Sequence, residues 1–116
     1  MLKIIIAGGR DYSDYKRLET IMDNIIGDRT DVEIVTGLAS GADFYGLVYA
    51  NRKGLPVAKF PANWDKFGKS AGLRRNSEMG QYADVLVAFW DYSSRGTKHM
   101  IDLMKAFRKP LKIFKY

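Results

Sequence analysis

Apolar residues occur in two arrangements that alternate along the whole chain. Five short runs are almost continuously apolar, which is typical of strands buried on both faces of a parallel sheet. They cover residues 2–7, 32–36, 56–60, 84–90 and 111–115. Between these runs, apolar residues recur every three or four positions, as on the buried face of a helix. The alternation predicts an α/β fold with a five-stranded, mostly parallel sheet and helices on both of its faces.

Four helices are expected between the strands, over residues 18–26, 43–53, 74–82 and 97–107. Asp43 is of a residue type that caps helix N-termini, so we expect it to begin the second helix. The apolar residues expected to share a helix face are Leu18, Ile21, Met22, Ile25, Ile26, Phe44, Leu47, Val48, Met100, Ile101, Met104 and Phe107.

The segment from residue 61 to residue 72 is the one connection long enough to form a lid or a binding loop. It contains the aromatic residues Trp64 and Phe67. Such rings can stack on a nucleotide base, and packing in the core is the alternative for at least one of them.

The composition limits the chemistry that the chain can perform. With 116 residues, one domain over residues 1–116 is expected. The absence of cysteine excludes disulfides, thiolate metal sites and cysteine nucleophiles, and a single histidine, His99, excludes a multi-histidine metal site. We therefore predict neither a metal nor a cofactor. No apolar run approaches the roughly 18 residues of a membrane span. The short apolar start continues into Gly-Gly-Arg-Asp rather than a cleavage site, so a cytoplasmic protein is predicted.

A formal net charge of +6 favours anionic partners such as nucleotides or nucleic acid, although solubility alone is an alternative explanation. Three glycine-containing loops, at residues 8–10, 37–43 and 94–97, each join a predicted strand to a predicted helix. In a parallel sheet these loops emerge at one edge, where helix N-termini attract phosphate or carboxylate groups.

Each loop taken alone has a simpler interpretation. Glycines turn the chain, Asp43 and Thr97 cap helices, and the dinucleotide-binding and P-loop fingerprints are absent. The coincidence of three loops on one edge nevertheless predicts a ligand site. The candidate binding residues are Gly8, Gly9, Arg10, Asp11, Gly37, Ser40, Gly41, Asp43, Arg75, Asn76, Ser94, Arg95, Gly96 and Thr97.

Among charged residues, Arg10, Arg75 and Arg95 are candidates for bidentate phosphate contacts. Candidate catalytic carboxylates are Asp43, Glu78 and Asp91, whereas His99 is expected to be a surface or packing residue.

Four segments resemble one family. They are Gly-Gly-Arg-Asp-Tyr at residues 8–12, Thr-Gly-Leu-Ala-Ser-Gly-Ala-Asp at residues 36–43, residues 60–79, and Arg-Gly-Thr-Lys-His-Met-Ile at residues 95–101. Together they are similar to the YspA-like family of the SLOG superfamily, which also contains the DprA and LOG proteins. The resemblance implies a single Rossmann-like domain with a nucleotide-type pocket. Since SLOG relatives often self-associate, it also implies a homodimer.

LOG proteins are phosphoribohydrolases, and their Pro-Gly-Gly-x-Gly-Thr motif is followed closely by glutamates. By this resemblance, Arg75 takes the place of an arginine beside the site, and residues 96–97 match the end of the glycine motif. However, His99 and Met100 stand where the glutamates would be, and such a hydrolase needs a carboxylate.

The leading hypothesis is therefore a domain that binds a nucleotide-derived small molecule, as a sensor, a carrier or a sequestering protein. One alternative is an enzyme that cleaves an N-glycosidic bond of a nucleotide, in the manner of a phosphoribohydrolase. The other is a binder of single-stranded nucleic acid, by analogy with DprA and through basic and aromatic side chains.

Overall fold

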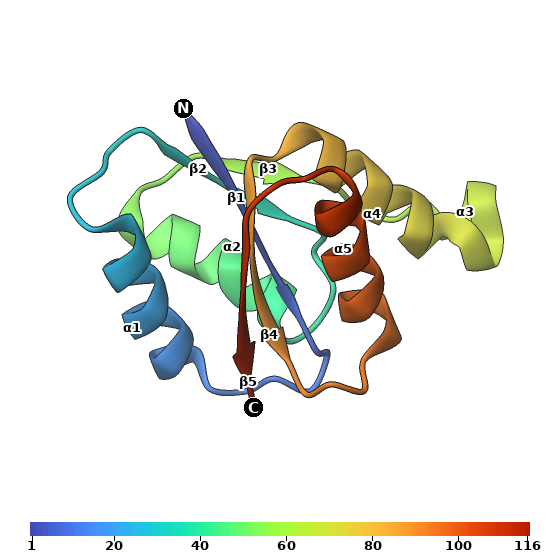
Figure 1. Cartoon of the computed structure of the whole chain (residues 1–116), viewed down its shortest axis with the longest axis horizontal. Helices are drawn as coiled ribbons and strands as arrows, with labels where there is room; N and C mark the ends of the chain where they lie inside the picture. The colour runs from blue at the N-terminus through green and yellow to red at the C-terminus, as the bar shows by residue number, and fades with distance from the viewer.

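All 116 residues are described by a computed structural model, whose centre is one sheet of five parallel strands. The strands are β1 (Leu2–Gly8), β2 (Val32–Thr36), β3 (Val57–Lys59), β4 (Val85–Trp90) and β5 (Leu111–Lys115). Their order across the sheet is β3-β2-β1-β4-β5, and every neighbouring pair is parallel (Figure 1). The predicted α/β fold is confirmed, with a sheet that is wholly rather than mostly parallel.

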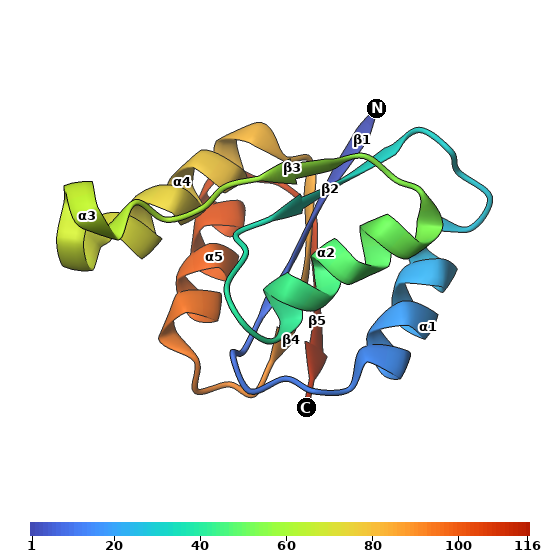
Figure 2. The same cartoon turned by 180° about the vertical axis from the view of Figure 1, so that it is seen from behind.

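Two helices cover each face of the sheet. Helices α1 (Tyr15–Ile26) and α2 (Ala42–Lys53) cover one face, and α4 (Ala71–Tyr82) and α5 (Arg95–Ala106) cover the other (Figures 1 and 2). Because successive side chains of a strand point to opposite faces, β1 contributes to both cores.

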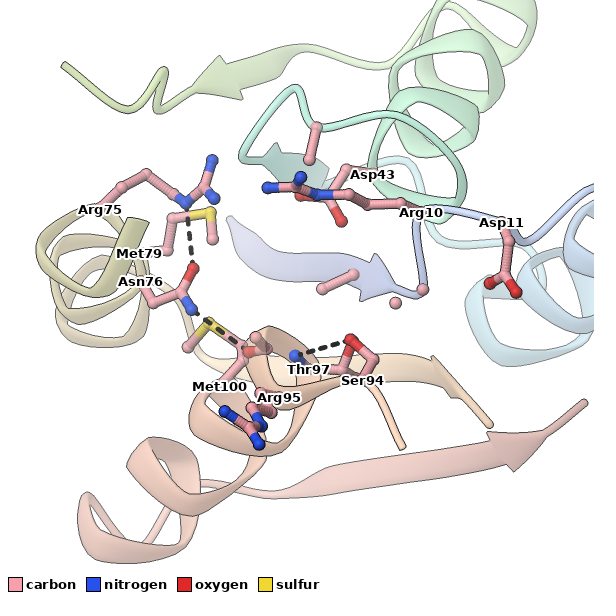
Figure 3. A pocket seen from close by; sticks show the side chains of 15 residues that line it. Arg10, Asp11, Asp43, Arg75, Asn76, Met79, Ser94, Arg95, Thr97 and Met100 are labelled. Atoms are coloured by element: carbon pink, nitrogen blue, oxygen red, sulfur yellow. Dashed lines mark hydrogen bonds between the residues drawn. The ribbon is translucent and has the colours of Figure 1, made fainter. Parts of the chain in front are cut away.

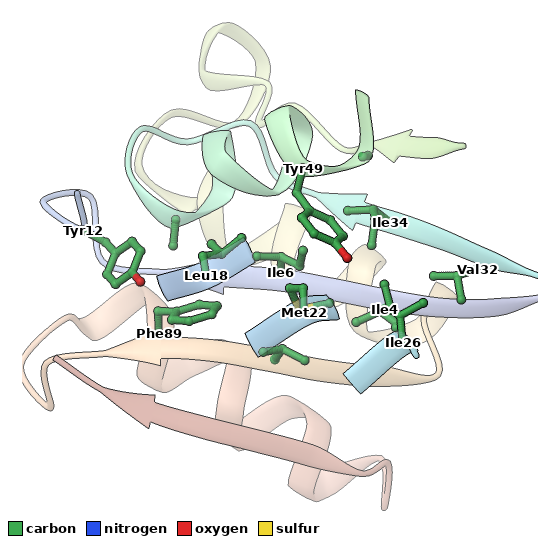
Figure 4. Close-up of a cluster of buried hydrophobic side chains, with 13 residues drawn as sticks. Ile4, Ile6, Tyr12, Leu18, Met22, Ile26, Val32, Ile34, Tyr49 and Phe89 are labelled. Atoms are coloured by element: carbon green, nitrogen blue, oxygen red, sulfur yellow. The ribbon is translucent and has the colours of Figure 1, made fainter. Parts of the chain in front are cut away.

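Ile4 and Ile6 of β1 pack with Leu18 and Met22 of α1 in the core of Figure 4. Ile5 belongs to the second core, on the side of α4 and α5.

The direction in which the chain winds reverses between β1 and β4. From β1 the chain proceeds to β2 and β3 on one side, and then returns to place β4 on the other side of β1. The connections after β1 and β4 therefore leave in opposite directions, which opens a crevice at the carboxyl ends of these two strands.

The expected loop at residues 61–72 is instead largely helical. It contains the short helix α3 (Trp64–Phe67) and a 3-10 turn, η1 (Gly68–Ser70), and α4 begins at Ala71 rather than at residue 74. Asn63 allows this early turn, because its side chain accepts a hydrogen bond from the amide of Lys66 at 3.1 Å. We call α3 and η1 together the arm. None of its residues is buried, and it projects away from the sheet (Figures 1 and 2).

The buried face of α2 differs from the predicted one. Phe44 is 50% exposed, whereas Gly46 and Tyr49 are buried. A side chain at Gly46 would begin only 3.0 Å from Cβ of Ile6, so glycine allows α2 to lie close to β1. The predicted buried face is wrong because the pattern of large apolar residues does not indicate a contact that is made through a glycine. Phe107 likewise lies beyond the end of α5 and is exposed rather than buried.

Helices in this fold are all too short or too polar to cross a membrane.

Candidate functional site

A cavity of about 400 Å³ lies at the carboxyl ends of β1 and β4, at the crevice described above. We call it the edge cavity. Its volume falls within the range of about 300–1,000 Å³ that is usual for small-ligand pockets. Fifteen residues line it (Figure 3): Ala7, Gly8, Gly9, Arg10, Asp11, Ala39, Asp43, Arg75, Asn76, Met79, Ser94, Arg95, Gly96, Thr97 and Met100.

Most of the predicted binding residues lie together in this cavity, and three do not. Gly37, Ser40 and Gly41 are absent from its lining. Gly37 and Gly41 instead support residues that do line it. Sequence reasoning missed Ala7, Ala39, Met79 and Met100, which contribute the apolar part of the wall.

Glycines let the loops after β1 and β2 approach each other closely. Gly41, with φ of 78°, precedes α2, and a side chain there would begin 2.2 Å from the carbonyl oxygen of Gly9. Gly8 has the same constraint against the carbonyl oxygen of Phe89 in β4. These positions therefore need glycine for packing, and this packing fixes the backbone that carries Arg10.

Arg75 and Asn76 of α4 connect the loops around the cavity. Arg75 Nη1 donates to the carbonyl oxygen of Gly37 at 2.6 Å, and Arg75 Nε donates to Asn76 Oδ1 at 3.0 Å. Asn76 Nδ2 lies 3.3 Å from the carbonyl oxygen of Gly96 and 3.2 Å from His99 Nδ1. Arg75 is the fifth residue of α4, so it lies beyond the first turn, where the helix dipole would disfavour a cation.

Two guanidinium groups face the same part of the cavity. Figure 3 shows Arg10 and Arg75 on either side of the loop that follows β2. Burial lowers the pKa of Arg75, Asp43 raises it, and the nearby charge of Arg10 lowers it further. Arginine remains charged in proteins, so the two cations repel each other across the cavity. An anion bound between them would relieve this repulsion.

The start of α5 provides free hydrogen-bond donors. Ser94 is the N-cap, because its Oγ accepts from the amide of Thr97 at 3.4 Å, which corrects the prediction that Thr97 caps this helix. Gly96 is the second residue of the helix rather than a turn residue. The amides of Arg95 and Gly96 have no acceptor one turn earlier in the helix and no other partner in the chain. They are therefore available to an anion.

Asp91 stabilises the loop before α5 and does not line the cavity. Its Oδ1 accepts hydrogen bonds from the amides of Ser93 and Ser94, each at 2.9 Å. These bonds hold the pKa of Asp91 below its usual value. Glu78 also lies outside the edge cavity, in a shallow groove between α4 and α5 that His99 shares. Of the three candidate catalytic carboxylates, Asp43 alone lines the cavity.

The prediction that Asp43 is the N-cap of α2 is wrong. Gly41 occupies that position, and Asp43 is the second residue of the helix, with only 6% of its surface exposed. Burial raises the pKa of Asp43 to about 6, against the lowering effects of Arg75 and of the backbone amides of Gly8, Gly37 and Ala39.

Asp11, the other acidic residue of the cavity, accepts a hydrogen bond from Tyr116 Oη at 2.6 Å. Burial has the largest effect on the pKa of Tyr116 and raises it, and the bond to Asp11 raises it further. This contact between the last residue and the first loop brings Tyr116 beside Gly9, a position that no local pattern indicates.

Trp64 and Phe67 lie on the arm and outside the edge cavity. Trp64 is 51% exposed, and the guanidinium of Arg74 lies 4.4 Å above the Phe67 ring. Neither ring can therefore stack on a ligand in the cavity in this conformation.

The charges and free donors of the cavity lining favour an anion over a cation. Three arginines and unpaired helix amides outnumber two carboxylates, and one of these is already bound to Tyr116. No group of three or more histidine, aspartate or glutamate side chains lies close enough together to hold a metal ion.

Comparisons with known proteins agree with this architecture. The X-ray structure of DNA processing protein A (DprA) from Streptococcus pneumoniae superimposes with a TM-score of 0.81 at 15% sequence identity. The match covers 97% of this chain and 50% of the DprA chain, so this chain spans half the length of that protein. At this identity the likeness shows a shared Rossmann-like fold. Among curated proteins, none matches the sequence.

The family model of the YspA, cpYpsA-related SLOG family matches residues 2–67. This range is more than half of the chain and contains the loops after β1 and β2. The chain therefore belongs to the YspA, cpYpsA-related SLOG family.

Proposed function

We propose that this protein binds a nucleotide-derived small molecule in the edge cavity, through the phosphate groups of that molecule. The observation that carries the proposal is the convergence of Arg10, Arg75 and the start of α5 on one cavity of about 400 Å³. Membership of the SLOG family supports a nucleotide-type ligand.

In this proposal, the phosphate lies between the guanidinium of Arg10 and the free amides of Arg95 and Gly96. Guanidinium groups bind phosphate in a bidentate manner, and helix N-termini add unpaired donors and a partial positive charge. Arg75 contributes a second positive charge, and its bonds to Gly37 and Asn76 hold it in place before the ligand arrives. A preorganised site of this kind loses little entropy on binding.

The apolar wall suits the less polar part of such a molecule. Met79 and Met100 are each about 1% exposed, and both line the cavity. Methionine is flexible and polarisable, so it adapts to the edge of a sugar or an aromatic base. Such a domain would act as a sensor, a carrier or a sequestering protein.

A thermal-shift screen with AMP, ADP, ADP-ribose, NAD and cyclic AMP tests this function. A ligand at about 100 times its dissociation constant adds roughly 2.7 kcal/mol of stability. For a chain of this length, we expect a rise in melting temperature of several degrees. A panel without any shift, measured on folded protein, would contradict the proposal.

Binding of single-stranded nucleic acid is a second candidate, and the charge of the arm together with the residues on either side of it favours it. Residues 59–75 contain five basic residues and one acidic residue, and so carry much of the chain's net charge of +6. Trp64 is the exposed ring on which a base would stack. The structural likeness to DprA, a DNA processing protein by its name, agrees with this candidate.

The two functions respond differently to salt. Affinity for an oligonucleotide should fall steeply as salt rises, because each neutralised phosphate releases counterions. Trp64→Ala should weaken oligonucleotide binding and leave the affinity for a mononucleotide unchanged. An oligonucleotide affinity that is insensitive to both salt and Trp64→Ala would exclude this use of the arm.

A further inference from the structure

Asp43 is a buried carboxylate in a cavity that otherwise attracts anions. It is 6% exposed, it lines the edge cavity, and Gly41 has already taken the capping position of α2. Thr36 Oγ1, at the end of β2, donates to the backbone carbonyl of Asp43 at 2.8 Å and fixes the residue there. Capping therefore does not explain why a carboxylate lies at this position.

Gly37 creates the space in which Asp43 and Arg75 lie side by side. A side chain at Gly37 would begin 2.6 Å from Arg75 Nη1 and 2.9 Å from Asp43 Oδ2. Even so, the two charged groups form no ion pair, and Arg75 Nη1 donates to the Gly37 carbonyl oxygen instead. The backbone amides of Gly8, Gly37 and Ala39 also face the carboxylate. Since its two oxygens offer about four acceptor sites, the carboxylate can still accept from one additional donor.

An ionised carboxylate only accepts hydrogen bonds, and it repels phosphate oxygens. A phosphate in this cavity must therefore lie toward Arg10 and the start of α5, away from Asp43. The part of the ligand that reaches Asp43 must carry a donor such as a hydroxyl group. In a 5′-nucleotide, the ribose 2′- and 3′-hydroxyls are donors on the same sugar that carries the phosphate.

We propose that Asp43 is a specificity-determining residue that accepts a hydrogen bond from a ribose hydroxyl, so that the edge cavity selects ribonucleotides over their deoxy counterparts. This inference rests on the proposed function, because it assumes a nucleotide in the edge cavity. Hydrogen bonds to a charged acceptor of this kind correspond to roughly 10- to 100-fold in affinity.

The test compares the affinities of AMP, 2′,3′-dideoxy-AMP and IMP by isothermal titration calorimetry at pH 7.5. We expect AMP and IMP to bind similarly, and dideoxy-AMP roughly 10- to 100-fold more weakly. Equal affinities of AMP and dideoxy-AMP would overturn the role of Asp43 and leave the proposed function intact. Preference for AMP over IMP without a hydroxyl effect would also overturn it, because the donor would then be the base amine. If none of the three bound, the proposed function itself would fail.

Asp43→Asn removes the charge at nearly constant shape. We expect this variant to bind AMP more weakly, and dideoxy-AMP equally well or more tightly because a nearby negative charge is gone. Asp102→Asn is the control, because it makes the same change at an exposed carboxylate outside the edge cavity, where Lys98 donates to it. This control should keep the preference for AMP, and loss of the preference in both variants would contradict a specific role for Asp43.

A second measurement needs no variant. The charged groups around Asp43 are Arg75 of α4 and Arg10 after β1, and arginine side chains are cationic in proteins. Since the pKa of Asp43 is about 6, the ratio of AMP to dideoxy-AMP affinity should decline between pH 7.5 and pH 5. Protonation of the nucleotide phosphate affects both ligands alike and cancels in this ratio. A ratio that rises as the pH falls would overturn the proposal.

Discussion

Arg75 Nε donates a hydrogen bond to Asn76 Oδ1 at 3.0 Å, so two neighbouring residues of α4 form one rigid group at the wall of the edge cavity. Through Arg75 the group reaches Gly37 after β2, and through Asn76 it reaches Gly96 in α5. Asn76 is buried, and its amide satisfies partners on both sides. Side chains of α4 thus hold the loop after β2 and the start of α5 in fixed positions around the cavity.

Asn76→Ala should loosen this arrangement. The variant leaves Arg75 Nε and His99 Nδ1 without their partner, so we expect a loss of about 1–2 kcal/mol in the free energy of unfolding. Affinity for the nucleotide should fall as well, because Arg75 is no longer fixed. Urea denaturation and calorimetric titration measure the two effects. Ser77→Ala, at the next position of the same helix, is the control and should change neither quantity by much. Unchanged affinity in Asn76→Ala would show that the Arg75–Asn76 bond does not organise the site.

Gly96 and Gly72 provide a matched pair, since each is the second residue of its helix. A side chain at Gly96 would meet nothing within 4 Å, and one at Gly72 would make an ordinary contact with Trp64 at 3.4 Å. Replacing glycine by alanine in a helix is stabilising by roughly 0.5–1 kcal/mol. We expect both variants to be as stable as the natural chain or more so. Gly96→Ala should nevertheless weaken nucleotide binding, because its methyl group enters the space of the phosphate. Full affinity in Gly96→Ala would argue against phosphate at the start of α5.

Asp43→Asn should also change the dependence of stability on pH. Burial raises the pKa of Asp43 to about 6 from its usual value of 3.8, so the folded state holds this proton more tightly than the unfolded state. The stability that this provides is fully present below pH 3.8 and is lost as the pH rises through about 6. At pH 7.5 the variant should therefore be more stable than the natural chain, by about 1–3 kcal/mol.

This gain in Asp43→Asn should vanish near pH 4, as measured by urea denaturation across the pH range. Asp102→Asn is the contrasting control. Asp102 is exposed, and its bond to Lys98 lowers its pKa, so this variant should not be stabilised at neutral pH. A gain for Asp43→Asn that persists at pH 4 would show that it does not come from the buried charge.

Cleavage of the nucleotide is not expected. Glu78 and Asp91 lie outside the edge cavity, and His99 and Met100 occupy the positions at which the LOG resemblance would place glutamates. Prolonged incubation with AMP followed by chromatography should therefore yield no adenine. Adenine release that Asp43→Asn abolishes would establish the enzymatic alternative and assign its carboxylate.

The sequence predicted the fold well because strands buried on both faces leave a strong local signal. The apolar runs located all five strands, and the glycine loops indicated the edge of the sheet at which the cavity lies. The prediction of α2 was less accurate, because its packing depends on a missing side chain, Gly46, against Ile6. The helical arm was missed since its short turns carry no apolar periodicity.

Contacts between distant segments could not be predicted from local patterns. Tyr116 reaches Asp11, and His99 reaches Asn76, only because the sheet places their elements side by side. Asp43 illustrates a different limit. Its position before a helix favoured a cap, whereas the N-cap is Gly41, two residues earlier, so that Asp43 lies inside the helix and is buried. The cytoplasmic location and the homodimer stay predictions.

Arg75 and Arg74 allow the most direct test of the central claim. The two are adjacent in the sequence, but Arg75 lines the edge cavity and Arg74 lies over Phe67 of the arm. Calorimetric titration of AMP should show at least tenfold weaker binding for Arg75→Ala, because a hydrogen bond to a charged partner contributes about 1.5–3 kcal/mol. Arg74→Ala should bind AMP as the natural chain does. Equal affinities of the two variants, or the larger loss in Arg74→Ala, would contradict nucleotide binding in the edge cavity.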